Sequence, residues 1–209
     1  MTVLNKIACL QGRRDEVPNQ ELARELAETK NIEGIQEIAT ALWNLDPNIQ
    51  SDCVKVLYEI GYLNPELIAG YVEDFLKLLK SRNNRLVWGS MLALSTIASL
   101  KPAEIDAQLA LIQKTMEAGS VITVDNGVKI LSALAVALPD RSGEIFPYLL
   151  KHLATCRPKD VPQHSEKILA AVDAANKTEF IRILEGRMQD LSGNQVSRVR
   201  KVIKEAHTR

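Results

Sequence analysis

Hydrophobic and polar positions alternate along this chain with a helical period. The clearest example is residues 84–102, NRLVWGSMLALSTIASLKP. Apolar residues recur there at intervals of three and four, a polar turn precedes them, and Lys101-Pro102 follows them. This spacing predicts an amphipathic helix with one buried face, which the proline brings to an end.

The same pattern recurs at a nearly constant interval. Equivalent leucines lie 37, 37 and 38 residues apart, at Leu57, Leu94, Leu131 and Leu169. Flanking positions repeat as well: two further apolar sets (Val56, Ala93, Ile130, Ile168 and Ile60, Ile97, Leu134, Val172), a set of small residues (Cys53, Ser90, Gly127, Ser165) and three prolines (Pro65, Pro102, Pro139). A constant register of this kind predicts stacked helical hairpins rather than a bundle without repeats.

Capping and proline signals predict the other helices. Residues 3–10 form a short first helix, and Asn19 caps the next one. Asp46-Pro47 begins a helix over residues 48–62, and Asn64-Pro65 ends it and begins another. The remaining predicted helices span residues 32–45, 66–80, 103–119, 121–138, 144–155, 165–175, 177–191 and 194–207, with an irregular connection over 155–164.

The segment RNNRLVWGSMLALSTIASLKPAEIDAQLALI resembles a HEAT repeat of the armadillo/HEAT superfamily. It has a basic and polar turn, an ALxxIA core, a proline and a second helix. The resemblance covers residues 19–193. It implies an all-α, right-handed α-solenoid of about five helical hairpins, which forms a single domain over residues 1–209. Residues 1–18 would then be an N-terminal cap and the basic residues 194–209 a C-terminal cap helix.

Composition agrees with a helical chain, since 46% of residues are hydrophobic but only 4% are aromatic. The 26 basic and 26 acidic residues balance, so the overall charge does not indicate nucleic acid or an anionic membrane as a partner. The apolar runs are too short for a membrane span, and the N-terminal sequence becomes charged too early for a signal peptide. We therefore expect a cytoplasmic protein with no membrane partner.

Known catalytic motifs are missing from the sequence: it has no GxSxG, P-loop, HExxH or glycine-rich phosphate loop. We therefore expect no enzyme, no catalytic residues and no cofactor. The three cysteines are far apart and form neither a disulfide pattern nor a zinc motif. His152 and Cys156 lie four residues apart on one helix face, but two ligands do not make a site, so we also expect no metal.

Candidate binding residues come from the repeat register just before each buried core. Two polar sets occupy equivalent positions there: Asp52, Gly89, Asn126, His164 and Ser51, Trp88, Asp125, Gln163. Stacked hairpins would bring them to one edge, where Trp88 has the size and the N–H donor typical of a binding hot spot. The alternative is that the polar residues only cap helices and that Trp88 packs on a loop.

The connection 155–164 adds Arg157 and Lys159 beside His164. It could bind an anion at a helix N-terminus, or it could be only a stiff link between repeats. The predicted partner-binding residues are thus Trp88, Asp52, Asp125, Asn126, Gln163, His164, Arg157 and Lys159. The basic residues of 194–209 could form a phosphate-binding patch, but a solvated outer face of a cap helix is the interpretation we favour.

Two functions remain. The first is a non-catalytic protein-interaction scaffold that binds a partner on its helical-repeat surface. The alternative is a nucleic-acid-binding protein related to the HEAT-like DNA glycosylases specific for alkylated bases, an analogy at the level of fold. Residues 66–80 hold two lysines against three acidic residues, and residues 103–117 hold one against three. A DNA groove needs more positive charge than that, so we expect a protein partner rather than nucleic acid.

Overall fold

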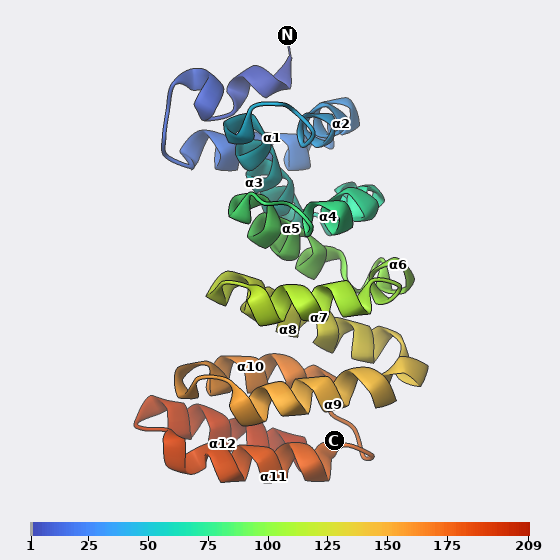
Figure 1. Ribbon diagram of the computed structural model, residues 1–209, viewed down its shortest axis with the longest axis vertical. Coiled ribbons are helices and arrows are strands. Elements are labelled where there is room, and N and C mark those ends of the chain that lie inside the picture. Colours follow the sequence, from blue (N-terminus) through green and yellow to red (C-terminus); the bar gives the residue numbers. More distant parts are fainter. Residues whose placement is uncertain (1) are drawn as a thin grey trace. The chain divides into compact units, whose positions relative to one another are not determined.

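The computed structural model describes residues 2–209. Within that range the regular secondary structure consists entirely of α-helices and 3-10 turns (Figure 1). The chain divides into two compact units, Met1–Asn126 and Gly127–Arg209, and the boundary falls within helix α8 (Val121–Ala137). Among the described residues, no helix combines the length and the apolar character needed to cross a lipid bilayer. The prediction of one domain over residues 1–209 stays a prediction.

In the first unit, a central helix α3 packs against both α1 and α5. Helix α2 packs on α3, and α4 packs on α5 and α6. The elements before α8 are the 3-10 turns η1 (Val3–Lys6) and η2 (Cys9–Gln11), then α1 (Val17–Thr29), α2 (Ile32–Ala41), α3 (Pro47–Leu63), η3 (Pro65–Leu67), η4 (Ala69–Tyr71), α4 (Val72–Leu78), α5 (Asn84–Ile97), α6 (Pro102–Asp106) and α7 (Leu109–Ala118).

In the second unit, α9 packs on both α10 and α11, while α12 packs on both α10 and α11. Its elements after α8 are α9 (Pro139–Thr155), η5 (Pro158–Asp160), α10 (Val161–Ile168), η6 (Leu169–Ala171), α11 (Lys177–Arg187), η7 (Met188–Asp190) and α12 (Asn194–Ala206). His152 lies in α9, His164 in α10 and His207 directly after α12, and the first two lie close to each other.

The repeated apolar positions form the core. Leu57, Leu94 and Leu131 are fully buried, and Leu169 is 7% exposed. The flanking apolar sets and the small residues at the preceding register position are buried as well. The register read from the sequence therefore identified the inward face of four successive repeats correctly.

Predicted start signals are also confirmed. The Asp46 carboxylate accepts a hydrogen bond from the Asn48 backbone N–H at 2.8 Å, and Pro47 occupies the first turn of α3. Helix α5 begins in the same way, because the Asn83 side chain accepts from the Arg85 N–H at 3.0 Å.

Residues 3–10 do not form the predicted helix. They make two 3-10 turns, because Ile7 between them is extended (ψ 153°) and its side chain is fully buried. The Glu37 carboxylate accepts from the Val3 and Leu4 backbone N–H groups at 3.2 and 3.1 Å. The Glu37 side chain thus satisfies backbone N–H groups at the start of this segment, which have no partner within a helix.

Two predicted second helices are broken into pieces. The segment 66–80 passes through two 3-10 turns before α4, and the segment 103–119 splits into α6 and α7 at Ala107-Gln108. Apolar residues on both sides of each break are buried, namely Ile68 and Val72 at the first and Ile105 and Leu109 at the second. Each break therefore lies between two segments that both contribute to the core.

Prolines explain two further differences. Helix α9 begins at Pro139 rather than at residue 144, and α10 begins at Val161, with Pro162 in its first turn. Proline is well suited to a first turn because the N–H it lacks has no partner there. Much of the expected irregular connection 155–164 is therefore helical.

Close approach of α3 and α5 depends on Gly89. A Cβ atom added at this residue would lie 2.8 and 3.0 Å from the two methyl carbons of Val54, which is buried in α3. Such distances are shorter than van der Waals contact, and a β-branched side chain in a packed core has little room to move. Gly89 therefore has a packing role in the polar register set to which the sequence assigned it.

We expect Gly89→Ala to lower the free energy of unfolding by about 1–3 kcal/mol through overpacking, measured as a shift of the urea midpoint. The matched control is Gly143→Ala in α9, where an added Cβ meets no heavy atom within 4 Å. That variant should be stabilised slightly, since alanine is the better helix former. Equal stability of G89A and wild type would contradict the close approach.

Candidate functional site

A polar pocket of about 370 Å³ in the first unit brings together Trp88 and Asp52, two of the predicted binding residues. Segments from η2, the turn before α1, and helices α1, α3 and α5 supply its lining: Ala8, Cys9, Arg13, Arg14, Asp15, Glu16, Asn19, Asn48, Ser51, Asp52, Lys55, Arg85 and Trp88. The repeat register predicted that these two side chains lie near each other, and in this unit they line the same pocket.

Asp52 holds the N-terminal segment in place. One carboxylate oxygen accepts from the Cys9 backbone N–H at 2.7 Å, and the other accepts from the Asn19 side-chain amide at 2.9 Å. The Asn19 amide oxygen in turn accepts from the Ala8 N–H at 2.9 Å, and Asn19 is 2% exposed. Asn19 is therefore a buried linker within α1 and not the predicted helix cap. Both partners of Asp52 are donors, and a carboxylate can accept from each with a separate oxygen, whereas an asparagine amide would place its NH₂ group against one of them.

Lys55 forms the inner wall of the pocket. Its ammonium group lies 2.8 Å from Glu16 and 2.7 Å from Glu59, and 4.9 Å from the centre of the Tyr58 ring. Burial alone would lower the pKa of Lys55, but the hydrogen bonds to the two glutamates outweigh burial and raise it. Lys55 is therefore protonated, and its positive charge is balanced by the carboxylates of Glu16 and Glu59.

Trp88 is half-buried, and its ring packs on Tyr58 with 6.1 Å between ring centroids. Two exposed cations, Arg14 and Arg85, line the same pocket. Neither makes an ion pair with any residue in 2–209, whereas Asp15 is paired with Arg13 and Glu16 with Lys55. The pocket therefore presents an aromatic ring beside two uncompensated guanidinium groups.

The other predicted binding residues lie elsewhere. Asp125 and Asn126 are in α8 and do not line this pocket, and the Asn126 side chain donates to the Ile122 carbonyl at 2.8 Å. In the second unit, Arg157 pairs with Asp160 at 2.6 Å, while Lys159 is exposed and Gln163 is half-buried. His164 is only 1% exposed, so it is not available on the surface to a partner.

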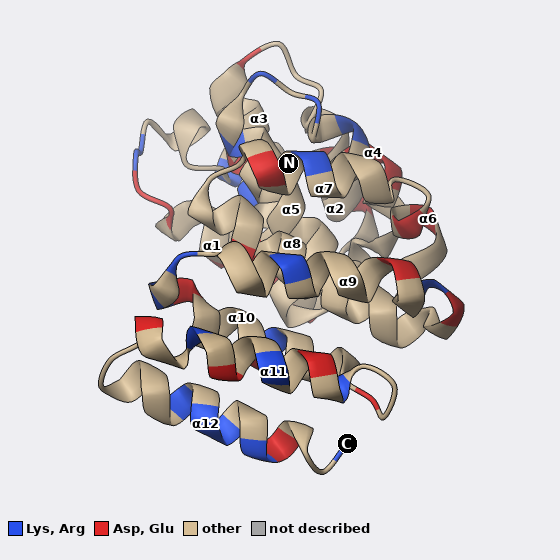
Figure 2. Cartoon of the chain, turned by 60° about the horizontal axis from the view of Figure 1, so that its bottom comes forward, with Lys and Arg blue, Asp and Glu red and all other residues tan. Residues whose placement is uncertain are grey.

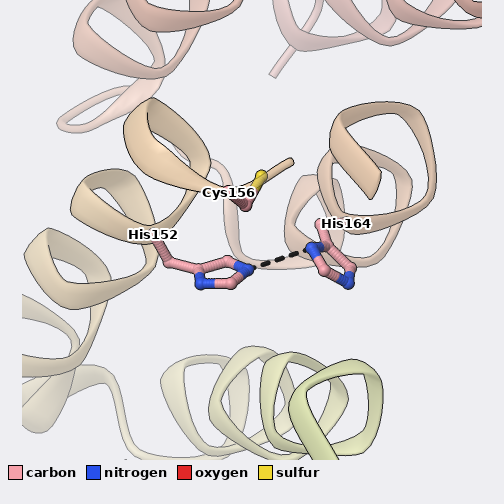
Figure 3. Close-up of side chains that lie close together, drawn as sticks. All are labelled: His152, Cys156 and His164. Atoms are coloured by element: carbon pink, nitrogen blue, oxygen red, sulfur yellow. Dashed lines mark hydrogen bonds between the residues drawn. The ribbon is translucent and has the colours of Figure 1, made fainter. Parts of the chain in front are cut away.

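His164 instead meets the pair that the sequence analysis had set aside, His152 and Cys156 (Figure 3). The ligand atoms of these three side chains all lie within 4.8 Å of one another. His152 Nε2 and His164 Nδ1 are 3.0 Å apart and hydrogen-bonded. His152 and Cys156 come from the last turn of α9 and the residue after it, and His164 comes from the first turn of α10.

Arg187 holds the end of α9 beside this cluster. It donates to the carbonyls of Leu153 and Cys156 at 2.6 and 2.8 Å, and it pairs with Asp190 at 2.7 Å. Burial raises the pKa of the Cys156 thiol, and Arg187 acts in the opposite direction. The backbone around Cys156 is therefore fixed from a third helix, α11.

The basic C-terminal helix exposes its charges. Lys and Arg residues follow one another along α12 (Figure 2), while Val199, Val202 and Ala206 are buried beneath them. Arg198 is paired with Glu166 at 2.7 Å, so part of this charge is compensated. These features agree with a solvated outer face on a cap helix.

We expect Asp52→Asn to lower the free energy of unfolding by about 2 kcal/mol, because the added amide group must face a donor and one charge-assisted hydrogen bond is lost. Urea denaturation measures the change. Glu28→Gln, at an exposed position of α1, is the control and should leave the urea midpoint unchanged. A D52N protein as stable as wild type would show that the carboxylate does not hold the N-terminal segment.

The same variant should change the reactivity of Cys9. Burial, and next the hydrogen bond and negative charge of Asp52, raise the pKa of Cys9 to about 12. Removing the carboxylate charge lowers that pKa and increases the thiolate fraction at pH 8, so iodoacetamide should alkylate Cys9 faster in D52N than in wild type. Peptide mass spectrometry measures the rate, with Cys156 as the internal reference, because Asp52 does not affect the pKa of that thiol.

Comparisons with known proteins inform the fold. No protein-family model matches the chain, and no curated protein matches it. Among solved structures, a designed armadillo repeat protein in complex with the peptide (KR)4 is 17% identical, over 90% of this chain and 86% of that chain, with a TM-score of 0.69.

Two further structures cover nearly the whole chain. A computationally designed armadillo repeat protein for modular peptide recognition is 14% identical over 97% of this chain and 98% of its own, with a TM-score of 0.68. An engineered protein from the Northeast Structural Genomics Consortium is 18% identical over 100% and 98%, with a TM-score of 0.66. The predicted all-α solenoid class is thus confirmed, and the chain has a helical-repeat fold like that of designed armadillo repeat proteins.

Proposed function

We propose that the protein is a non-catalytic interaction scaffold, and that the pocket around Trp88 binds a segment of a partner protein that carries acidic side chains. The observation that supports this proposal is the position of Trp88 beside Arg14 and Arg85, two cations without an ion-pair partner among residues 2–209. Such binding depends on apolar contact with Trp88 and on attraction to the two arginines, and it requires no catalytic residue.

Charge favours an acidic segment. The pocket lining holds four cationic and three acidic side chains. Each acidic side chain already has a partner: Arg13 for Asp15, Lys55 for Glu16, and two N–H donors for Asp52. A carboxylate from another chain would gain a bidentate, charge-assisted contact with a guanidinium group and displace no existing pair.

Trp88 supplies the apolar part of the contact. Its ring is half-buried and supported by Tyr58, so little conformational freedom is lost when a partner covers it. Tryptophan and arginine are the residues most enriched at interface hot spots, and here they share one pocket. The volume of about 370 Å³ is large enough to hold one or two side chains.

The structural neighbours support a peptide-binding role for the fold. One was designed for modular peptide recognition, and another is bound to (KR)4, a basic peptide. The excess of cations around Trp88 favours a peptide of the opposite sign for this chain. Asp125, Asn126, Gln163, Arg157 and Lys159 remain predicted additional contacts.

We expect a random-sequence peptide library displayed on phage, selected on the full-length protein, to yield peptides enriched in Asp and Glu. Their affinity, measured by isothermal titration calorimetry, should fall at least about 10-fold for Trp88→Ala and for Arg85→Glu, since hot-spot contacts contribute more than 1 kcal/mol each. Higher salt should also weaken binding.

Matched controls come from the same unit. Trp43→Ala removes the other tryptophan, which is 50% exposed and lies outside the pocket, and Arg24→Glu reverses an exposed charge on α1. Both should bind like wild type. Peptides that bind W88A and R85E as tightly as wild type would overturn the proposal. The melting temperature of W88A must equal that of wild type, because a loss of several degrees would mean that Trp88 stabilises the fold by packing. In that case the affinity of R85E alone tests the proposal.

Single- and double-stranded DNA oligonucleotides form a second arm of the same experiment. If they bind through Arg85 more tightly than any selected peptide, the protein-partner proposal fails and the nucleic-acid alternative replaces it. The steep salt dependence of phosphate contacts distinguishes that outcome.

A further inference from the structure

We infer that His152, Cys156 and His164 form a binding site for a zinc ion in the second unit, with one thiolate and two imidazole ligands (Figure 3). The inference is independent of the proposed partner pocket, because none of these residues lines that pocket. It rests on ligand type, geometry and support from surrounding residues.

Convergence of these residues is the first observation. The chain has three histidines and three cysteines in 209 residues, and two of the histidines meet one of the cysteines. Their ligand atoms lie within 4.8 Å of one another, although the residues come from two helices and the turn between them. Thiolate and imidazole are the ligands that zinc prefers in proteins, while calcium and magnesium select oxygen.

Distances fit a tetrahedral ion after small movements. Zn–N bonds of 2.0–2.1 Å separate two imidazole nitrogens by about 3.3 Å in a tetrahedral site, and the observed separation of His152 Nε2 and His164 Nδ1 is 3.0 Å. A Zn–S bond of about 2.3 Å places sulfur about 3.6 Å from each nitrogen. Since Sγ already lies within 4.8 Å of both, each sulfur–nitrogen distance has to shorten by at most about 1.2 Å.

A zinc ion can replace the hydrogen bond between the two histidine rings without leaving a proton in the site. In the hydrogen bond between the two rings, one nitrogen donates and the other accepts. On binding, the donating ring changes tautomer, so that its proton moves to its other nitrogen and both facing nitrogens offer a lone pair. Cys156 releases its thiol proton to solvent and binds as thiolate.

Supporting contacts hold the ligands in position. His164 is 1% exposed, so its ring is held by packing. The Cys156 backbone N–H donates to the His152 carbonyl at 2.8 Å, and Arg187 fixes the Cys156 carbonyl. Pro158 and Pro162 limit the freedom of the turn that joins the two ligand-bearing helices.

Three protein ligands leave one tetrahedral position for water or for a side chain from a partner. Because the ion would join the end of α9 to the start of α10, binding should also stabilise the second unit.

The test uses full-length protein dialysed against a chelator and titrated with Co²⁺, which reports tetrahedral geometry and thiolate coordination through its visible and near-ultraviolet absorption. We expect one equivalent to bind, with a sulfur-to-cobalt charge-transfer band that stoichiometric Zn²⁺ abolishes. Zinc should also raise the melting temperature.

Variants then assign the ligands. Cys156→Ser and His152→Gln should each weaken zinc binding at least about 100-fold, since loss of a supporting residue alone costs 10–100-fold. His207→Gln and Cys9→Ser remove a histidine and a cysteine outside the cluster and should bind like wild type. Circular dichroism checks that each variant is folded, and if C156S is not, H152Q decides.

A second measurement needs no variant. Zinc should slow iodoacetamide alkylation of Cys156 in the wild-type protein and leave Cys9 unaffected. The inference is wrong if no zinc or cobalt binds, if C156S and H152Q bind as tightly as wild type, if H207Q loses binding equally, or if zinc does not protect Cys156. Tight binding of Cu²⁺ without binding of Zn²⁺ would overturn the assignment to zinc.

Discussion

Burial of one apolar face per repeat is the constraint on which the rest of this structure depends. An isolated hairpin cannot cover the face that carries Leu57 or Leu94, so it must pack against the next one along the chain. Close packing requires small residues at the contact, which explains why Gly89 lies over Val54. The polar side chains beside these positions are consequently held at fixed places, and the pocket around Trp88 and Asp52 is built from them.

Periodic features could be predicted from the sequence because they depend on local chemistry. Equivalent leucines, the Asp46-Pro47 start and the aliphatic composition all act within one or two helical turns, and the structure agrees with each. Two other predictions failed because the partner of a residue lies far along the chain. Asn19 has the right type for a cap, yet Asp52 engages it from 33 residues away. Residues 3–10 have helical spacing, yet Glu37 and the buried Ile7 decide their conformation.

In the candidate sites too, local features could be predicted from the sequence and contacts that depend on tertiary packing could not. Trp88 and Asp52 share a pocket because the repeat register places them on neighbouring helices, and that register is visible in the sequence. His164 escaped detection as a neighbour of His152 because the segment before it was interpreted as an irregular link. One signal was present: Pro162 marks the first turn of α10, and an earlier helix start turns His164 toward the end of α9. The angle between two helices, however, cannot be obtained from local spacing.

The anchoring of the N-terminal segment has a consequence for biosynthesis. Cys9 is held by Asp52, which lies 43 residues later in the chain, and Val3 is held by Glu37, 34 residues later. During translation residues 3–10 therefore have no stable position until α2 and then α3 have followed them. These residues are synthesised before their partners and complete their structure late, so the nascent chain exposes the apolar face of α1 until α3 has been synthesised.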